Sequence, residues 1–307
     1  MFATRSGAAR LALGTVIVLI AVKVIVAIVT GSISITAQAM DSALDLIAVI
    51  VTFFAIRIAM MPADKEHPFG HAKAEGIAAI IQAVLIVGAG SFIAYSAIRR
   101  IIDGATVEMT EAGIGVMLFS MVVSILLARH LHRVSRTTQS LALEASARNI
   151  TADIYSAAGV LLAMIIIRFT GLVILDPIIA LGVTALIFKS AYDVIRESVR
   201  ELADVRLPEE EEQILTSTIN EHRDQLSGFH SIRSRKAGDQ RFIDLHLVMP
   251  RNATLEEAHA MCDHLEEDIR KKLSHTSVTI HCEPCRMDCR ECFVISCSLR
   301  RQPSGLR

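Results

Sequence analysis

The stretch Ala39-Met40-Asp41-Ser42-Ala43-Leu44-Asp45-Leu46 places two carboxylates four residues apart inside a long apolar run. On a helix this spacing puts Asp41 and Asp45 on one face, one turn apart. A charged side chain near the centre of a bilayer costs about 2.5–3.5 kcal/mol on insertion scales. The cost must be offset by other polar groups, by water or by a cation, so the stretch predicts a membrane helix that carries a polar site.

A second apolar run repeats the spacing with an amide and a carboxylate, Asn149 and Asp153. Two such pairs on facing helices would supply four oxygen-bearing side chains, which could enclose one divalent metal ion. The alternative is a polar seam that only holds two helices together. Because both runs have the same spacing, we favour the metal site.

The composition agrees with a membrane domain followed by a soluble domain. The 307 residues are 52% hydrophobic with a mean hydropathy of +0.47, and the charged residues concentrate after about residue 200. A spanning helix needs about 20 apolar residues, and the first run is too long for a signal peptide. The net charge of −1, with no basic cluster among aromatics, gives no sign of nucleic-acid binding. We expect six spanning helices at 11–29, 33–60, 77–97, 112–131, 143–167 and 172–191.

The orientation follows from the Lys and Arg residues of the short connecting segments. With the N-terminus inside, the cytoplasmic side holds Arg5, Arg10, Lys65, Lys73, Arg129, Arg133, Arg136, Arg196 and Arg200, and the outer side holds Arg99, Arg100 and Arg168. This bias predicts that both termini lie in the cytoplasm.

The segment after the sixth run has the pattern of a small α+β domain. Pro208 followed by four Glu indicates a helix start, because acidic residues are favoured in a first turn. We expect helices at 208–223 and 255–273, and strands at 229–235, 241–248 and 278–283, in the order α-β-β-α-β. The predicted division is a membrane domain at 1–203, a soluble domain at 204–284 and a Cys-rich tail at 285–307.

Two further groups of side chains have the chemistry of metal ligands. Asp64, His67 and His71 fall in the loop between the second and third helices, where imidazole would suit a metal such as zinc. In the soluble domain, His281 and Glu283 share one face of their strand, and the alternation places His246 on a solvent face. His230 and His259 also fall on a predicted strand or helix. The alternative for both groups is a set of polar surface residues that bind no metal.

These features together resemble the cation diffusion facilitator family, and within it the bacterial ferrous-iron and zinc efflux transporters. The strings His-Pro-Phe-Gly-His-Ala-Lys-Ala-Glu at 67–75 and Phe-Ile-Asp-Leu-His-Leu at 242–247 are the most telling. The resemblance spans about residues 11–285. It implies a homodimer with a metallochaperone-like cytoplasmic domain, and metal export coupled to proton entry by alternating access.

The resemblance also implies roles for individual residues. The transport site falls on Asp41, Asp45, Asn149 and Asp153, and a loop site on Asp64, His67 and His71. A cytoplasmic site for two metals at the dimer contact falls on His230, His246, His259, His281 and Glu283. A charge pair between the two domains falls on Lys73 and Asp204.

The sequence departs from the family pattern at two places. Asn149 stands where zinc-handling members usually have His, and an all-oxygen site suits harder ions. The second departure is the tail, because five cysteines lie between Cys282 and Cys297. They predict either a soft-metal cluster or a redox-labile end, and Cys282 is expected to point toward the core.

We therefore expect a proton-coupled efflux transporter for zinc, iron(II) or manganese, not an enzyme, in a cell membrane such as a bacterial inner membrane. One alternative is a membrane sensor or scaffold that binds metal without transporting it. Another is an intramembrane aspartyl protease, which needs two Asp on separate helices sharing one proton. Here the two acids of the first pair lie on the same turn.

Overall fold

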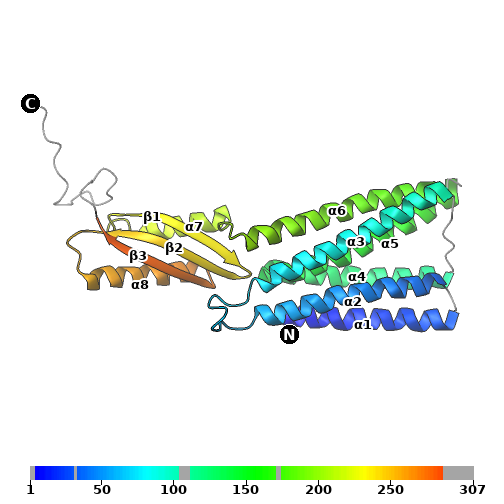
Figure 1. Cartoon of the computed structure of the whole chain (residues 1–307), viewed down its shortest axis with the longest axis horizontal. Helices are drawn as coiled ribbons and strands as arrows, with labels where there is room; N and C mark the ends of the chain where they lie inside the picture. Colours follow the sequence, from blue (N-terminus) through cyan, green and yellow to red (C-terminus); the bar gives the residue numbers. More distant parts are fainter. Residues whose placement is uncertain (1–3, 31–32, 104–110, 171–173, 286–307) are drawn as a thin grey trace, which may run out of the picture. The chain divides into compact units, whose positions relative to one another are not determined.

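The computed structural model describes residues 4–30, 33–103, 111–170 and 174–285. Its contacts divide the chain into two compact units, Met1–Leu202 and Ala203–Arg307. Among the described residues, the first unit contains six long helices, and the second contains a three-stranded sheet with two helices (Figure 1). This architecture confirms the predicted fold class.

The helices of the first unit are 26 to 30 residues long, and each overlaps most of one predicted apolar run. The second ends at Ala59 and the sixth begins at Leu175, so these two do not contain the whole run. Several continue past the predicted end, because the apolar run marks only the part suited to a bilayer. The sixth helix, for example, continues through the charged turns at Arg196 and Arg200 to Leu202 instead of ending near 191. The bounds are α1 (Arg5–Thr30), α2 (Ile33–Ala59), α3 (Ala74–Asp103), α4 (Glu111–Thr138), α5 (Leu141–Thr170) and α6 (Leu175–Leu202).

Within the described residues, α1, α3, α4 and α6 each contain a segment long and apolar enough to cross a membrane. The remaining two long helices, α2 and α5, are the ones that carry the predicted oxygen ligands.

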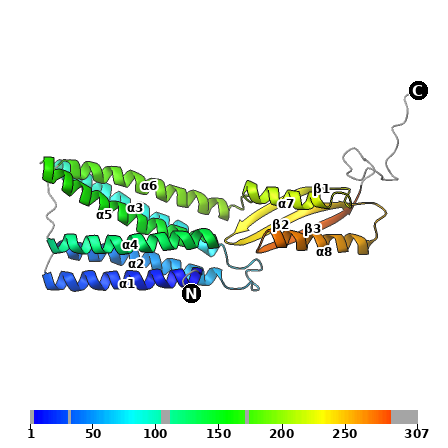
Figure 2. The same cartoon turned by 180° about the vertical axis from the view of Figure 1, so that it is seen from behind.

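The packing of the first unit brings α2 and α5 into contact and pairs α3 with α6 (Figures 1 and 2). Small residues allow α6 to approach its neighbours closely. A Cβ atom at Gly159 of α5 would lie 2.8 Å from Val183 of α6, and one at Gly90 of α3 would lie 2.9 Å from Phe188. Fully buried side chains such as Ile56, Leu131 and Leu143 fill the contact among α2, α4 and α5.

The second unit confirms the predicted α-β-β-α-β order. Its elements are α7 (Glu209–Glu221), β1 (Gly228–Ala237), β2 (Gln240–Met249), α8 (Leu255–Lys272) and β3 (Thr276–Pro284). The central strand β2 pairs antiparallel with β1 and parallel with β3. The parallel pairing requires a crossover connection, which α8 supplies.

One face of the sheet is apolar and covered, and the other is polar and open. On β2, Ile243, Leu245 and Leu247 are buried and alternate with Asp244 and His246, as the sequence predicts. The covering side chains come from α7 and α8, and they include Leu215, Ile219, Leu265 and Ile269. Cys282 packs against this core, which agrees with the predicted inward direction.

An ion pair ties the start of α7 to the central strand. Arg241 of β2 donates from Nη2 to Glu211 Oε1 at 2.6 Å and from Nε to Oε2 at 2.8 Å. The hydrogen bonds from Arg241 hold the pKa of the Glu211 carboxyl below its usual value. Both side chains are largely buried, at 11% and 15% exposed, so the two-bond geometry offsets the cost of removing the charges from water.

Strand β1 contains a bulge. His230 pairs with His246, and Arg233 pairs with Asp244, so three steps along β1 match two steps along β2. Ser231 absorbs the extra residue with a φ of 53°. Because side chains alternate along a regular strand, the bulge is what allows both His230 and Arg233 to lie on the open face.

Candidate metal sites

The predicted membrane site brings α2 and α5 face to face. Nδ2 of Asn149 donates to Oδ1 of Asp45 at 3.5 Å, and both residues are half-buried. Asp153 lies one turn further along α5 and is exposed. Asp41 lies on α2 one turn before Asp45, and its side chain falls outside the described residues. An amide and a carboxylate from two helices therefore meet where the spacing predicts.

A lysine of the first helix contacts α2 at the residue that follows Asp41. Lys23 of α1 donates from Nζ to Oγ of Ser42 at 2.6 Å, and Ser42 follows Asp41 on α2. The signal in the sequence was a lone lysine in the otherwise apolar run 11–29.

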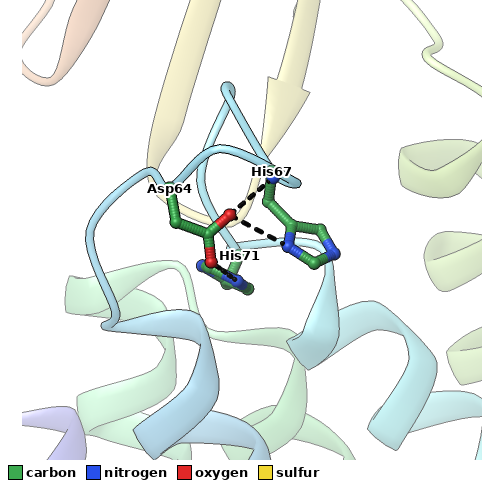
Figure 3. A group of neighbouring side chains, drawn as sticks. All are labelled: Asp64, His67 and His71. Atoms are coloured by element: carbon green, nitrogen blue, oxygen red, sulfur yellow. Dashed lines mark hydrogen bonds and ion pairs between the residues drawn. The ribbon is translucent and has the colours of Figure 1, made fainter.

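The loop between α2 and α3 brings its three predicted ligands together (Figure 3). Oδ1 of Asp64 lies 3.3 Å from Nδ1 of His67, and Oδ2 lies 3.4 Å from Nε2 of His71. Each carboxylate oxygen thus faces one imidazole. Gly70, with a φ of 81°, closes the turn by donating its N–H to the carbonyl of His67 at 2.9 Å.

Backbone groups also hold the Asp64 carboxylate in place. The N–H groups of His67 and Glu66 donate to Oδ1 at 2.6 and 2.9 Å. The bond from the His67 N–H is the main cause that lowers the pKa of Asp64. The carboxylate is therefore ionised near neutral pH, as a metal ligand must be.

On the open face of the sheet, four of the five predicted cytoplasmic ligands gather. Nε2 of His230 lies 2.6 Å from Oε1 of Glu283, and Nδ1 of His246 lies 3.9 Å from Oε2. These three residues form a possible ligand group with all ligand atoms within 4.8 Å. The ring of His281 lies 4.8 Å from that of His246, centroid to centroid, because the strand register aligns His230, His246 and His281 in one row.

The chemistry of this group fits a metal ion. Nδ1 of His246 is buried and has no hydrogen-bond partner among the described atoms. A buried polar atom without a partner is costly, and a cation shared with Glu283 would satisfy it. The fifth predicted ligand, His259, lies on α8, where Nε2 is 3.7 Å from Oδ2 of Asp263. Within one chain, the structure does not bring His259 together with the other four.

The remaining predicted residues have other neighbours. Nζ of Lys73 donates to the carbonyl of Leu202 at 3.5 Å, and Asp204 accepts from Arg235 at 3.4 Å. The pairing of Lys73 with Asp204 across the two units stays a prediction.

The cysteine tail is described only at its start. Cys282 and Cys285 are free thiols, and the later cysteines of the tail fall outside the described residues. On α8, burial raises the pKa of Cys262 to about 12, with a further contribution from Cys282, so this thiol stays protonated. A soft-metal cluster in the tail stays a prediction.

These features define a multi-pass membrane protein with candidate metal ligands in its bundle, in a loop and on a separate α+β domain. Residues 9–203 match the cation efflux transmembrane domain, and residues 207–285 match the cytoplasmic domain of cation efflux proteins. The chain therefore belongs to the cation diffusion facilitator family, as the resemblance indicated. It is a cation efflux transporter and not an enzyme, which excludes the aspartyl protease alternative.

Within the family, the chain is similar to the FieF efflux pumps. It is 33% identical over 288 residues to the cation-efflux pump FieF of Salmonella paratyphi A, covering 94% of this chain and 95% of that protein. It is 32% identical over 276 residues to the uncharacterized transporter sll1263 of Synechocystis sp., covering 90% and 89%. A solved chain of the transporter CzrB is 33% identical, covers 26% of this chain and 99% of that chain, and has a TM-score of 0.26.

Proposed function

We propose that this protein exports divalent first-row transition metals across a cell membrane in exchange for protons. The observation that carries the proposal is the contact between Asp45 on α2 and Asn149 on α5 inside the bundle of a cation efflux transporter. A carboxylate and an amide oxygen are ligands for the harder divalent ions, so iron(II) and manganese join zinc as candidate substrates.

The proposed transport site consists of Asp41, Asp45, Asn149 and Asp153. The transported ion would neutralise the carboxylates when the site is loaded. Protons would replace the ion after its release, because a carboxylate must lose its proton to bind metal. Protons that replace the metal ion neutralise the carboxylates of the empty site. The site can then return to its first orientation without carrying an uncompensated negative charge inside the membrane, which would be costly.

We further propose that the protein works as a homodimer with resident metals on its cytoplasmic units. The match to the cytoplasmic domain of cation efflux proteins supports this arrangement. His230, His246, His281 and Glu283 would hold these metals on the open face of the sheet. His259, which lies on α8 away from this cluster, would contribute to the site of a second copy. The Lys and Arg bias supports cytoplasmic termini, and a bacterial inner membrane is the proposed location.

Flux into proteoliposomes with a pH gradient tests the proposal. Zinc, iron(II), manganese, cobalt, nickel and cadmium would be compared as substrates. A pH dye outside the liposomes would report whether proton movement accompanies the metal flux. We expect metal flux that depends on the proton gradient in the wild type and is lost in Asp45→Ala. Asp193→Asn, which changes an acid on α6 that lies 3.7 Å from Arg148, serves as the matched control and should retain flux.

The same assay separates the transporter from a sensor or scaffold. A protein that binds metal in detergent but shows no metal flux in liposomes would be a sensor or scaffold. Equal flux in the wild type and in Asp45→Ala would remove the α2–α5 pair from the mechanism.

A further inference from the structure

A third cluster of ligand-type side chains joins α7 to α8, on the helical side of the soluble unit. His222 is the C-terminal cap of α7, and His264 and Asp268 lie one turn apart on α8. Oδ2 of Asp268 lies 3.1 Å from Nε2 of His222 and 3.5 Å from Nε2 of His264. One carboxylate oxygen therefore faces two imidazole nitrogens.

We propose that His222, His264 and Asp268 bind one divalent transition metal of the zinc class, at a site separate from the transport, loop and sheet sites. Zinc binds histidine nitrogen and carboxylate oxygen at about 2.0–2.2 Å in tetrahedral geometry, which separates neighbouring ligand atoms by about 3.3–3.6 Å. The two measured distances, 3.1 and 3.5 Å, are close to this separation. Three protein ligands leave a fourth position for water.

The orientation of the rings fits a shared ion. The imidazoles of His222 and His264 have centroids 5.0 Å apart and an interplanar angle of 82°. Perpendicular rings can both direct a nitrogen toward one point without stacking on each other. Three ligand atoms, one from each residue, lie within 4.8 Å of one another.

The surroundings prepare the carboxylate as a ligand. Nζ of Lys271 donates to Oδ1 of Asp268 at 3.1 Å and leaves Oδ2 directed at the histidines. The positive charge of Lys271 would repel a metal ion, but this side chain is 59% exposed and also forms an ion pair with Glu267.

The position of the cluster at the ends of the two helices also favours metal binding. The last carbonyl groups of α7 carry a partial negative charge that attracts cations. A second contact, Nζ of Lys272 to Glu221 at 2.6 Å, already holds the same helix ends together. His222 and Asp268 are only 11% and 22% exposed, so little side-chain freedom remains to be lost on binding. A metal here would fasten α7 to α8 on the side of the sheet opposite to the His230 and His246 site.

The competing interpretation is a hydrogen-bonded His–Asp–His contact that binds no ion. Metal counting on the full-length protein in detergent distinguishes the two. Zinc bound per chain would be measured after equilibrium dialysis in the wild type, His264→Gln, Asp268→Asn and the double variant His222→Gln/His264→Gln. We expect each variant to lose the same single zinc ion per chain, including the double variant, because its two histidines share one ion.

A matched control is available in the same unit. His275 lies 3.9 Å from Asp239 and belongs to none of the three-ligand groups found among the described residues. His275→Asn should therefore retain the full zinc content. Asparagine is chosen because residue 275 has a φ of 54°, which asparagine tolerates.

Cobalt(II) provides a second readout that does not depend on counting. A four-coordinate cobalt site absorbs visible light strongly, and His264→Gln, which alters a half-exposed side chain, should remove one such component without unfolding the protein. Unchanged zinc content and unchanged cobalt absorption in His264→Gln would overturn the proposal. Loss of two zinc ions in the double variant would also overturn it, because the histidines would then bind independently.

Discussion

Replacing Asn149 by histidine tests whether the α2–α5 pair sets metal preference. The amide of Asn149 donates to Asp45 at 3.5 Å, which is a long hydrogen bond. Its loss should cost no more than about 1.5 kcal/mol of folding stability, so the variant should fold and insert. The imidazole would lie one turn before Asp153 and would add a nitrogen ligand to a site that otherwise offers oxygen.

The expected result is a shift of preference toward zinc. Imidazole suits zinc better than manganese, and a differential of about 1.4 kcal/mol corresponds to a tenfold change in the ratio of affinities. We therefore expect the ratio of zinc flux to manganese flux in proteoliposomes to rise about tenfold at fixed pH. The variant should also lose flux more steeply as the pH is lowered, because an imidazole must be neutral before it binds metal.

Asn149→Gln is the control for altered packing, since it keeps the amide and adds one methylene group. It should not raise the ratio of zinc to manganese flux. A ratio in Asn149→His equal to that of the wild type, in a protein that still transports, would refute the reasoning and locate selectivity elsewhere in the molecule.

Three predictions concern the soluble unit. Leu247→Ala, at a fully buried position of the central strand, should destabilise the unit by about 3 kcal/mol, measured by hydrogen exchange of the β2 amides in the full-length protein. Arg241→Met should cost about 3 kcal/mol in the same assay, because it leaves the Glu211 carboxylate largely buried without its partner. The lowered pKa of Glu211 means that its contribution is complete above the ordinary value of 4.5 and is lost as the pH falls through the lowered value. Glu211→Gln should therefore flatten the acid side of a profile of melting temperature against pH, and an unchanged profile would contradict this assignment.

Much of the fold could be predicted because its signals are local. Apolar runs located the six long helices, and the alternation of Ile243, Leu245 and Leu247 with polar residues located the central strand. The helix ends were less predictable, because an apolar run reports the part that suits a lipid environment. Hydrogen bonding continues the helix beyond it, as at Arg196 and Arg200 of α6. The bulge at Ser231 left no comparable signal in the composition of β1.

The candidate sites also differ in how far local sequence patterns could predict them. Asp64, His67 and His71 were found from their spacing, because one loop supplies all three. The pairing of His230 with Glu283 joins residues 53 positions apart, and only the family resemblance suggested it. The contact of His222 with Asp268 spans 46 positions and was missed, because no pattern in either helix indicates which residue of the other helix it meets.

The bulge in β1 also affects how copies of this unit can associate. Strand β1 is at one edge of the sheet. A regular edge strand presents a row of unpaired backbone N–H and C=O groups, with which a strand of another chain can pair. The left-handed backbone at Ser231 interrupts that row, so a neighbouring copy is hindered from extending the sheet along β1. Self-association through strand addition, the usual start of amyloid-like growth, is thereby discouraged at this edge.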